Sequence, residues 1–279
     1  MTVSSLLTLS CRTKFTCFCF FNLQSTTFNV PPALFTSEIQ LTSVSHETAW
    51  RAASATEWQR AEGSRTQPSF QSQLADLSEG RGGDDDNALR NVPKPSEFAS
   101  YALISAILQS IFLRRQSISS SKAKELLISE CTKPLQRWRS LCESEQHPLI
   151  HAPLSPLSFN GSALLRLSYI RLLVDFGTVR AALTGNDPSR VATAVAALPA
   201  ITRSSEALRA AHHAASALRI VSRDPLEEIL ARLMLTPVLQ PTKLGIELAA
   251  RTQTFVWSLQ HSLCSFECGE CMRAPQWCQ

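Results

Sequence analysis

The sequence is poor in glycine, tyrosine and charge. Its 279 residues include 9 Gly and 2 Tyr, and charged residues make up 18%. So few glycines argue against a glycine-rich nucleotide-binding fold, and the abundance of Leu, Ala and Ser favours helices over a turn-rich β fold. Hydrophobic residues make up 44%, which excludes a wholly disordered chain, because such chains contain more charge and fewer aliphatic side chains. The length is sufficient for a large hydrophobic core.

Long apolar runs are also missing. A membrane-spanning helix needs about twenty predominantly apolar residues, whereas the stretch from Tyr101 to Leu113 is shorter and is interrupted by Ser105 and Gln109. The N-terminus lacks the order of a signal peptide, because Arg12 and Lys14 follow its first apolar stretch. We therefore expect no membrane partner and no secretion. The nine cysteines, an odd number, are expected to be reduced thiols.

Positive charge is modest and confined to the middle of the chain. The net charge is +4; residues 1–100 carry 8 basic and 10 acidic groups, residues 101–183 carry 10 and 5, and residues 184–279 carry 9 and 8. A nucleic-acid-binding domain shows a denser basic stripe, so the basic residues of the middle third are interpreted as a solvated helix face. Those on one expected helix are Lys122, Lys124, Lys133, Arg137 and Arg139.

Apolar residues recur at helical spacing along most of the chain, and no segment alternates as a strand does. We predict an all-α fold, a single multi-helix domain of roughly eight to ten helices. Ser45 and Asp187 are predicted helix N-caps, the latter with Pro188 at the first helical position. The expected helices cover 45–62, 96–115, 120–142, 160–184, a segment from 188, 204–221, 225–235 and 242–273.

The domain boundaries follow from changes in composition. Residues 1–30 are rich in Thr, Ser, Phe and Cys without a helical period, and are predicted to be a disordered or irregular tail of doubtful origin. Residues 31–273 form the predicted helical domain, with a loop at 80–95 that contains glycines, prolines and the Asp84–Asp86 run. Residues 274–279 form a divergent C-terminal end. The acidic run is interpreted as a solvated loop, because further oxygen ligands at metal-loop spacing are missing.

Three positions on the last expected helix carry zinc-type ligands. His261, Cys264 and Cys268 follow Trp257 at helical spacing, and imidazole and thiolates are zinc ligands. We favour packing, with the cysteines as small buried hydrophobes. Cys268, Cys271 and Cys278 match the first half of a binuclear zinc cluster, but the second half is missing and only Arg273 lies between them, so this motif is rejected.

No set of residues stands out as a catalytic site. His212 and His213 are adjacent in an Ala-rich segment, and adjacent helical residues point about 100° apart, so they do not face one metal together. Several Cys–His pairs are conceivable, but none is singled out as a nucleophile with its base. We therefore expect a protein that is not an enzyme, and we assign no catalytic, cofactor-binding, metal-binding or DNA-binding residue.

Four separated segments carry a family resemblance. They read PPALFTSEIQLTSVSHETAWRAASATEWQRA (31–61), PLSFNGSALLRLSYIRLLVDFGTVRAAL (156–183), RAAHHAASALRI (209–220) and LGIELAARTQTFVWSLQHSLCSFEC (244–268). Together, in this order, they resemble the regulatory (fungal-specific transcription factor) domain of fungal zinc-finger transcription factors. The sequence departs from that family in residues 1–30, where a finger is lacking, and after Cys268.

The resemblance implies an all-helical regulatory region that acts in regulation of DNA-templated transcription in the nucleus. Its partners would be transcriptional co-regulators or a second copy, and zinc and DNA binding would belong to the family's finger region, absent from this sequence. It also implies that His261, Cys264 and Cys268 are packing residues of the last helix. A stand-alone all-α protein-interaction module without DNA binding is the alternative. If Phe255 is a core residue, its replacement by Ala would cost about 3–5 kcal/mol.

Overall fold

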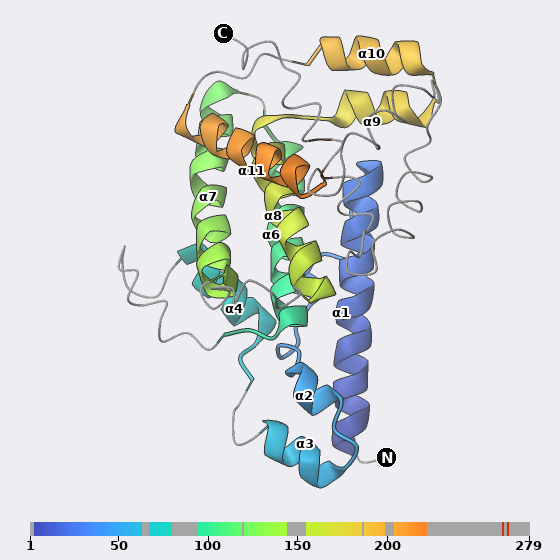
Figure 1. Ribbon diagram of the computed structural model, residues 1–279, viewed down its shortest axis with the longest axis vertical. Coiled ribbons are helices and arrows are strands. Elements are labelled where there is room, and N and C mark those ends of the chain that lie inside the picture. The colour runs from blue at the N-terminus through green and yellow to red at the C-terminus, as the bar shows by residue number, and fades with distance from the viewer. Residues whose placement is uncertain are drawn as a thin grey trace. The chain divides into compact units, whose positions relative to one another are not determined.

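The computed structural model describes residues 3–62, 67–79, 94–118, 120–143, 155–185, 187–198 and 204–221, together with Cys264 and Glu267. Over these residues the fold is all-α, as predicted, and its one β feature is an isolated bridge between Thr42 and Ser69. The helices are α1 (Val3–Phe28), α2 (Glu47–Trp50), α3 (Ala55–Glu62), α4 (Phe70–Glu79), α6 (Glu97–Arg115), α7 (Ser121–Glu143), α8 (Pro156–Leu173), α9 (Gly177–Thr184), α10 (Pro188–Ala196) and α11 (Ser205–Val221) (Figure 1).

The chain divides into two compact units, residues 1–161 and 162–279. The sequence pattern predicted one domain over 31–273. The structure instead groups the N-terminal segment with α2 to α7, and groups α9 to α11 with most of α8. Each unit is described by itself below.

Helix α6 is the centre of the first unit. Every residue from Tyr101 to Gln109 is buried, so this helix contacts protein on all sides, as a helix that is apolar around its whole circumference must. α1 and α7 pack against it, and α4 contacts both α6 and α7 (Figure 1). Ser96 begins the helix: its hydroxyl accepts a hydrogen bond from the Ala99 amide at 3.2 Å and donates to the Val44 carbonyl at 2.8 Å.

The prediction of an irregular tail over residues 1–30 is wrong. Helix α1 packs along α6 (Figure 1), and its Phe15 and Phe18 are fully buried with their rings edge-on to Phe70 of α4, at centroid distances of 5.0 and 5.9 Å. Asn29 ends the helix with a positive φ of 55°, and the Val30 amide donates to the Ser25 carbonyl, which is the Schellman arrangement. The buried positions of α1 do follow a helical period: Phe15, Phe18, Cys19, Asn22, Ser25 and Thr26. The last three of these residues are polar.

A buried amide network joins α1, α6 and the segment that connects α1 to α2. The Gln109 amide nitrogen donates to Asn22 Oδ1 at 2.7 Å and to the Leu34 carbonyl at 2.9 Å. Its oxygen accepts from the backbone amide and the hydroxyl of Thr36, both at 2.7 Å. The Asn22 amide in turn donates to the Phe18 carbonyl. Four hydrogen bonds therefore satisfy the buried Gln109 side chain, and they join α6 to α1 and to the segment that follows α1.

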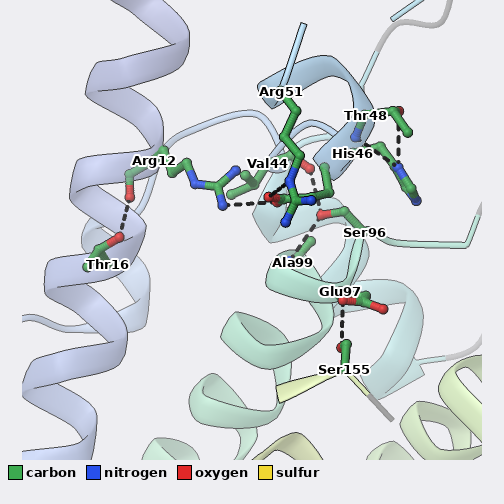
Figure 2. A network of polar contacts seen from close by, with 11 residues as sticks. Arg12, Thr16, Val44, His46, Thr48, Arg51, Ser96, Glu97, Ala99 and Ser155 are labelled. Atoms are coloured by element: carbon green, nitrogen blue, oxygen red, sulfur yellow. Dashed lines mark hydrogen bonds and ion pairs between the residues drawn. The ribbon is translucent and has the colours of Figure 1, made fainter. Parts of the chain in front are cut away.

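The segment 45–62, predicted as one helix, forms two short helices, α2 and α3. The predicted N-cap, Ser45, is one residue too early. His46 is the N-cap of α2, where its ring accepts from the Thr48 amide. Glu47 pairs with Arg12 of α1 and with Arg51 one turn later; the two arginines are labelled in Figure 2. The Arg12 guanidinium lies 4.3 Å from the Trp50 ring centroid, a cation–π distance. α2 is thereby attached to α1.

Helix α7 closes the first unit against the start of α8. The Trp138 indole N–H donates to the Ser100 carbonyl of α6 at 2.8 Å, and a Cβ atom added at Gly161 of α8 would lie 3.3 Å from the Trp138 ring. Glycine at this helical position therefore permits close approach to a buried indole. Pro156 begins α8, four residues before the helix start predicted at residue 160. Residues 144–154 and most of the loop predicted at 80–95 lie outside the described residues.

The second unit corrects the predicted helix over 160–184. The chain forms α8 and α9 with a break at residues 174–176, where the Asp175 carboxylate accepts from the Gly177 amide at 2.9 Å and so supports a new helix start. α9 and α10 lie side by side (Figure 1). Asp187 caps α10 as predicted, accepting from the Ser189 amide at 2.9 Å with Pro188 at the first position. The apolar residues of this region are buried: Leu164, Leu165, Leu167, Ile170, Leu172, Leu173 and Val174.

Two further observations concern the described part of the chain as a whole. None of its helices has the length and apolar character to cross a membrane. Its six cysteines are free thiols: Cys11, Cys17, Cys19, Cys131, Cys142 and Cys264.

Candidate functional site

A buried charge cluster lies in the second unit. Arg171 comes from α8 and Arg180 comes from α9. Glu267 is a helical residue much later in the chain. Arg171 donates from Nε and Nη2 to the two oxygens of Glu267, at 3.1 and 2.6 Å. Arg180 donates from Nη2 to Glu267 Oε1. The two-pronged contact from Arg171 is the geometry in which a guanidinium holds a carboxylate most specifically.

The break between α8 and α9 places both arginines at one carboxylate. Residues 174–176 interrupt the helix, and α9 then restarts at Gly177. Arg171 and Arg180 are nine residues apart, and on one straight helix that separation spans about 13 Å along the axis at 1.5 Å per residue. The structure instead brings both guanidinium groups onto the same Glu267 oxygen. We call the set of Arg171, Arg180 and Glu267 the arginine clamp.

The arginine clamp is almost completely removed from solvent. The Glu267 side chain is 0% exposed, and those of Arg171 and Arg180 are 10% and 9% exposed. Burial lowers the pKa of Arg180 below the ordinary value of arginine; the negative charge of Glu267 opposes this, and the like charge of Arg171 adds to it. One carboxylate between two guanidiniums leaves a formal excess of one positive charge. Removing one member of such a cluster is costly, because the charges that remain are buried without compensation.

A second pairing joins α8 to α11. The Tyr169 and His213 rings are stacked, with centroids 4.3 Å apart and planes inclined by 10°. His213 is buried and its neighbour His212 is exposed, which confirms the prediction that the two imidazoles point in different directions. Tyr169 lies two residues before Arg171 on α8, so α8 contacts both α11 and Glu267. This helix is the organising element of the second unit.

Cys264 is the one predicted zinc-type ligand that the structure describes. It lies three residues before Glu267, and its side chain is 2% exposed. Burial of the thiol agrees with its interpretation as a packing residue. Among the described residues, no three His, Cys, Asp or Glu side chains are grouped as metal ligands. The remaining positions named from the sequence lie outside the described residues: Asp84, Asp85, Asp86, Phe255, Trp257, His261, Cys268, Cys271, Arg273 and Cys278.

The basic residues of α7 are divided between structural and exposed positions. Arg137 donates to the carbonyls of Leu77 and Ser78, at 2.9 and 3.0 Å, and so satisfies backbone acceptors at the C-terminal end of α4. Lys122 and Lys133 are exposed. One member of the predicted solvated face is therefore a helix cap.

Sequence reasoning missed the arginine clamp, although one signal was available. Arg171 interrupts the apolar run from Leu164 to Val174, and a charged residue on a helix buried on most sides needs a partner. Similarly, Glu267 stands between Phe266 and Cys268 on the expected last helix. The sequence contains no indication that these two residues, 96 positions apart, are partners.

Comparison with known families gives one match. Residues 238–274 match the fungal transcription factor C-terminal domain, and this segment includes Cys264 and Glu267. The match continues past Cys268 and ends at residue 274. No curated protein and no solved structure matches the chain.

Proposed function

We propose that this chain is the regulatory region of a fungal transcription factor, that it acts in the nucleus through contacts with co-regulators or with a second copy, and that it is not an enzyme. The observation that carries the proposal is the similarity of residues 238–274 to the C-terminal domain of fungal transcription factors. Glu267 of that segment is held by Arg171 and Arg180 of α8 and α9. The matched segment is thus bound to α8 and α9, which lie almost wholly in the segment 156–183 that also resembles the regulatory domain.

DNA recognition would be supplied by a zinc-finger module outside these 279 residues, with zinc bound in that module. The described helices support this division of roles, because α7, which carries several of the basic residues of the middle third, uses Arg137 to cap α4. Phosphate contacts from its exposed lysines would carry no sequence information.

A reporter experiment tests the regulatory role. The full chain is fused to a heterologous sequence-specific DNA-binding domain and expressed in a fungal host with a reporter gene downstream of the matching site. We expect reporter transcription to change, by activation or repression, relative to the DNA-binding domain alone. An unchanged reporter, with the fusion demonstrated in the nucleus at equal abundance, would contradict the proposal.

The arginine clamp provides internal controls for the same assay. Glu267→Leu leaves two buried guanidiniums without a counter-ion and should abolish the reporter effect by disrupting the second unit. Simultaneous replacement of Arg171 and Arg180 by Met and of Glu267 by Leu removes all three charges and should restore it. If the triple variant folds but stays inactive, the charges themselves have a regulatory role.

The alternative, a stand-alone all-α protein-interaction module without DNA binding, is separated by the cellular location of the partners. A pull-down with the full chain from separated nuclear and cytoplasmic extracts should recover nuclear co-regulators if the regulatory proposal is right. Recovery confined to cytoplasmic partners would favour the stand-alone module.

A further inference from the structure

A groove in the first unit is unrelated to the arginine clamp. It has a volume of about 900 Å³ and lies among α4, α6, α7 and the segment Phe35–Ser37. All of its lining residues belong to the unit of residues 1–161. The volume falls within the range of about 300–1,000 Å³ that is typical of small-molecule sites. The elements that enclose it can be followed in Figure 1, where α4 lies beside α6 and α7.

Most of the surface that lines the groove is apolar. Leu74 comes from α4, Ile107 and Leu113 come from α6, and Phe35 and Pro134 complete the set from the two remaining segments. Ile107 belongs to the buried core of α6, so this wall is continuous with the packed interior of the unit. An apolar molecule of suitable size would gain about 25 cal/mol for each Å² of apolar surface that it buries.

Hydrogen bonds hold the wall opposite α7 in place. Gln109 binds the backbone and the side chain of Thr36, and the Gln71 amide donates to the carbonyls of Thr36 and Ile39, at 2.7 and 3.1 Å. Gln71, Gln109 and Thr36 all line the groove. Because these residues already bond to one another, binding would require little ordering of this wall, which is the condition for a preorganised site.

The polar part of the groove carries an excess of positive charge. Its charged residues are Arg114, Glu130 and Lys133. Arg114 pairs with Glu130 and also lies near the Cys131 thiol. Lys133 is exposed and forms no ion pair in the described part of the chain. A lysine ammonium with no carboxylate partner therefore stands at the edge of an apolar groove.

Hydroxyl groups and a helix irregularity add hydrogen-bonding capacity to the same surface. Ser37, Ser78, Ser110 and Ser129 line the groove. Pro134 lies inside α7 and has no N–H, so the Glu130 carbonyl lacks its regular helical donor. The lining thus offers hydroxyl donors in addition to the Lys133 ammonium.

We propose that this groove binds a small amphipathic organic anion, with its apolar body against α4 and α6 and its acidic group at Lys133. Charge complementarity selects an anion, and the apolar lining selects a ligand with an aromatic or aliphatic body. Binding is non-covalent: burial raises the pKa of the Cys131 thiol, with Arg114 opposing this, and a protonated thiol is a poor nucleophile. The site does not depend on the proposed role in transcription.

The test compares two fluorescent probes that share an aromatic body. 1-Anilinonaphthalene-8-sulfonate is an amphipathic anion, and N-phenyl-1-naphthylamine is its neutral counterpart without the sulfonate. Titrated into the full 279-residue chain, the anionic probe should bind at one saturable site and more tightly than the neutral probe. Lys133→Ala should weaken the anionic probe by roughly two- to fivefold, as expected for one partly exposed charge contact, and should leave the neutral probe unchanged.

Matched variants distinguish this groove from other apolar surfaces. Lys122→Ala removes an exposed lysine from the same helix, away from the groove, and should affect neither probe. Ser110→Trp places an indole in the groove and should abolish saturable binding of both probes, whereas Gln116→Trp, at the exposed C-cap of the same helix, should not. Thermal melting of each variant confirms that the fold is retained.

The outcomes are decisive in both directions. Equal loss of anionic-probe affinity in Lys122→Ala and Lys133→Ala would overturn the assignment of the acidic group to Lys133. Saturable binding that persists in a folded Ser110→Trp variant would place the probe elsewhere and overturn the groove as the site. A reporter effect in the preceding assay would be unaffected by either result, so the two proposals fail separately.

Discussion

Replacing Glu267 by Leu is the sharpest perturbation that the structure suggests. The substitution leaves Arg171 and Arg180 about nine-tenths buried, close to one another and without a counter-ion. Breaking a buried ion pair from one side costs about 3–5 kcal/mol. Because a domain is stable by only about 5–15 kcal/mol, the single variant should lose about a fifth or more of its stability.

For the triple variant Arg171→Met, Arg180→Met, Glu267→Leu, we expect the free energy of unfolding to stay unchanged or to rise. It replaces the charged side chains by apolar ones of similar length, so no ion remains to be desolvated. Such replacements are neutral or stabilising by about 1–4 kcal/mol. The triple variant should therefore unfold at a urea concentration equal to or above that of the wild type, although it contains the damaging Glu267→Leu change.

Urea unfolding of the full chain, followed by circular dichroism, measures both effects. Arg190→Met is the matched control, because Arg190 is an exposed arginine on α10, and surface changes usually stay within about 0.5 kcal/mol. The reasoning is refuted if Glu267→Leu unfolds within about 1 kcal/mol of the wild type. It is also refuted if the triple variant is as unstable as the single one, because the cost would then arise from shape and not from unpaired charge.

Three other predictions follow from the first unit and from the proposed division of roles. Burial opposes ionisation of Glu47, but hydrogen bonds from Arg12 and Arg51 outweigh it and lower its pKa. Its contribution is therefore present above the ordinary glutamate pKa and is lost as pH falls through the lowered value. Glu47→Gln should cost about 0.2–1 kcal/mol at pH 7 and nothing at a pH below both values, as measured by urea unfolding; an equal cost at both pH values would contradict the ion-pair explanation. Burial raises the pKa of the Cys19 thiol to about 12, with Ser105 opposing this. In the folded chain iodoacetamide should therefore alkylate the exposed Cys17 and spare Cys19, as read by peptide mass spectrometry, and equal labelling would show that α1 does not stay packed. Finally, the chain should bind duplex DNA no more tightly than about 10⁻⁴ to 10⁻⁶ M at physiological salt, without sequence preference; nanomolar, sequence-selective binding in a titration at two salt concentrations would show that it carries its own DNA-reading element.

Local signals in the sequence identified many of the helices. Asp187 and Pro188 indicate the start of α10, and the apolar run after Ser96 indicates α6. These predictions succeed because caps and helical periodicity depend on residues within a few positions of one another. The shortage of glycine and the abundance of helix formers were likewise sufficient to predict an all-α fold.

Buried polar residues account for the principal errors. Asn22 and Gln109 look like surface residues in a hydrophobicity pattern, yet they bond to each other in the interior. Half of the buried stripe of α1 is polar in this way, so a search for apolar periodicity assigned the segment to an irregular tail. The same holds for Arg171, which is buried because Glu267 is there to bind it.

The sequence by itself determined the helical class of this protein, the Asp187 cap that begins α10, and the resemblance to fungal transcription factor regulatory domains. Only the tertiary structure decided which polar residues are interior, that the helix predicted over 160–184 breaks between α8 and α9, and that Glu267 lies between Arg171 and Arg180. The reason is physical: periodicity and capping are short-range properties of the chain, whereas the free energy of burying a charge or an amide depends on a partner. Here that partner lies 96 residues away for Arg171 and 87 away for both Asn22 and Arg180.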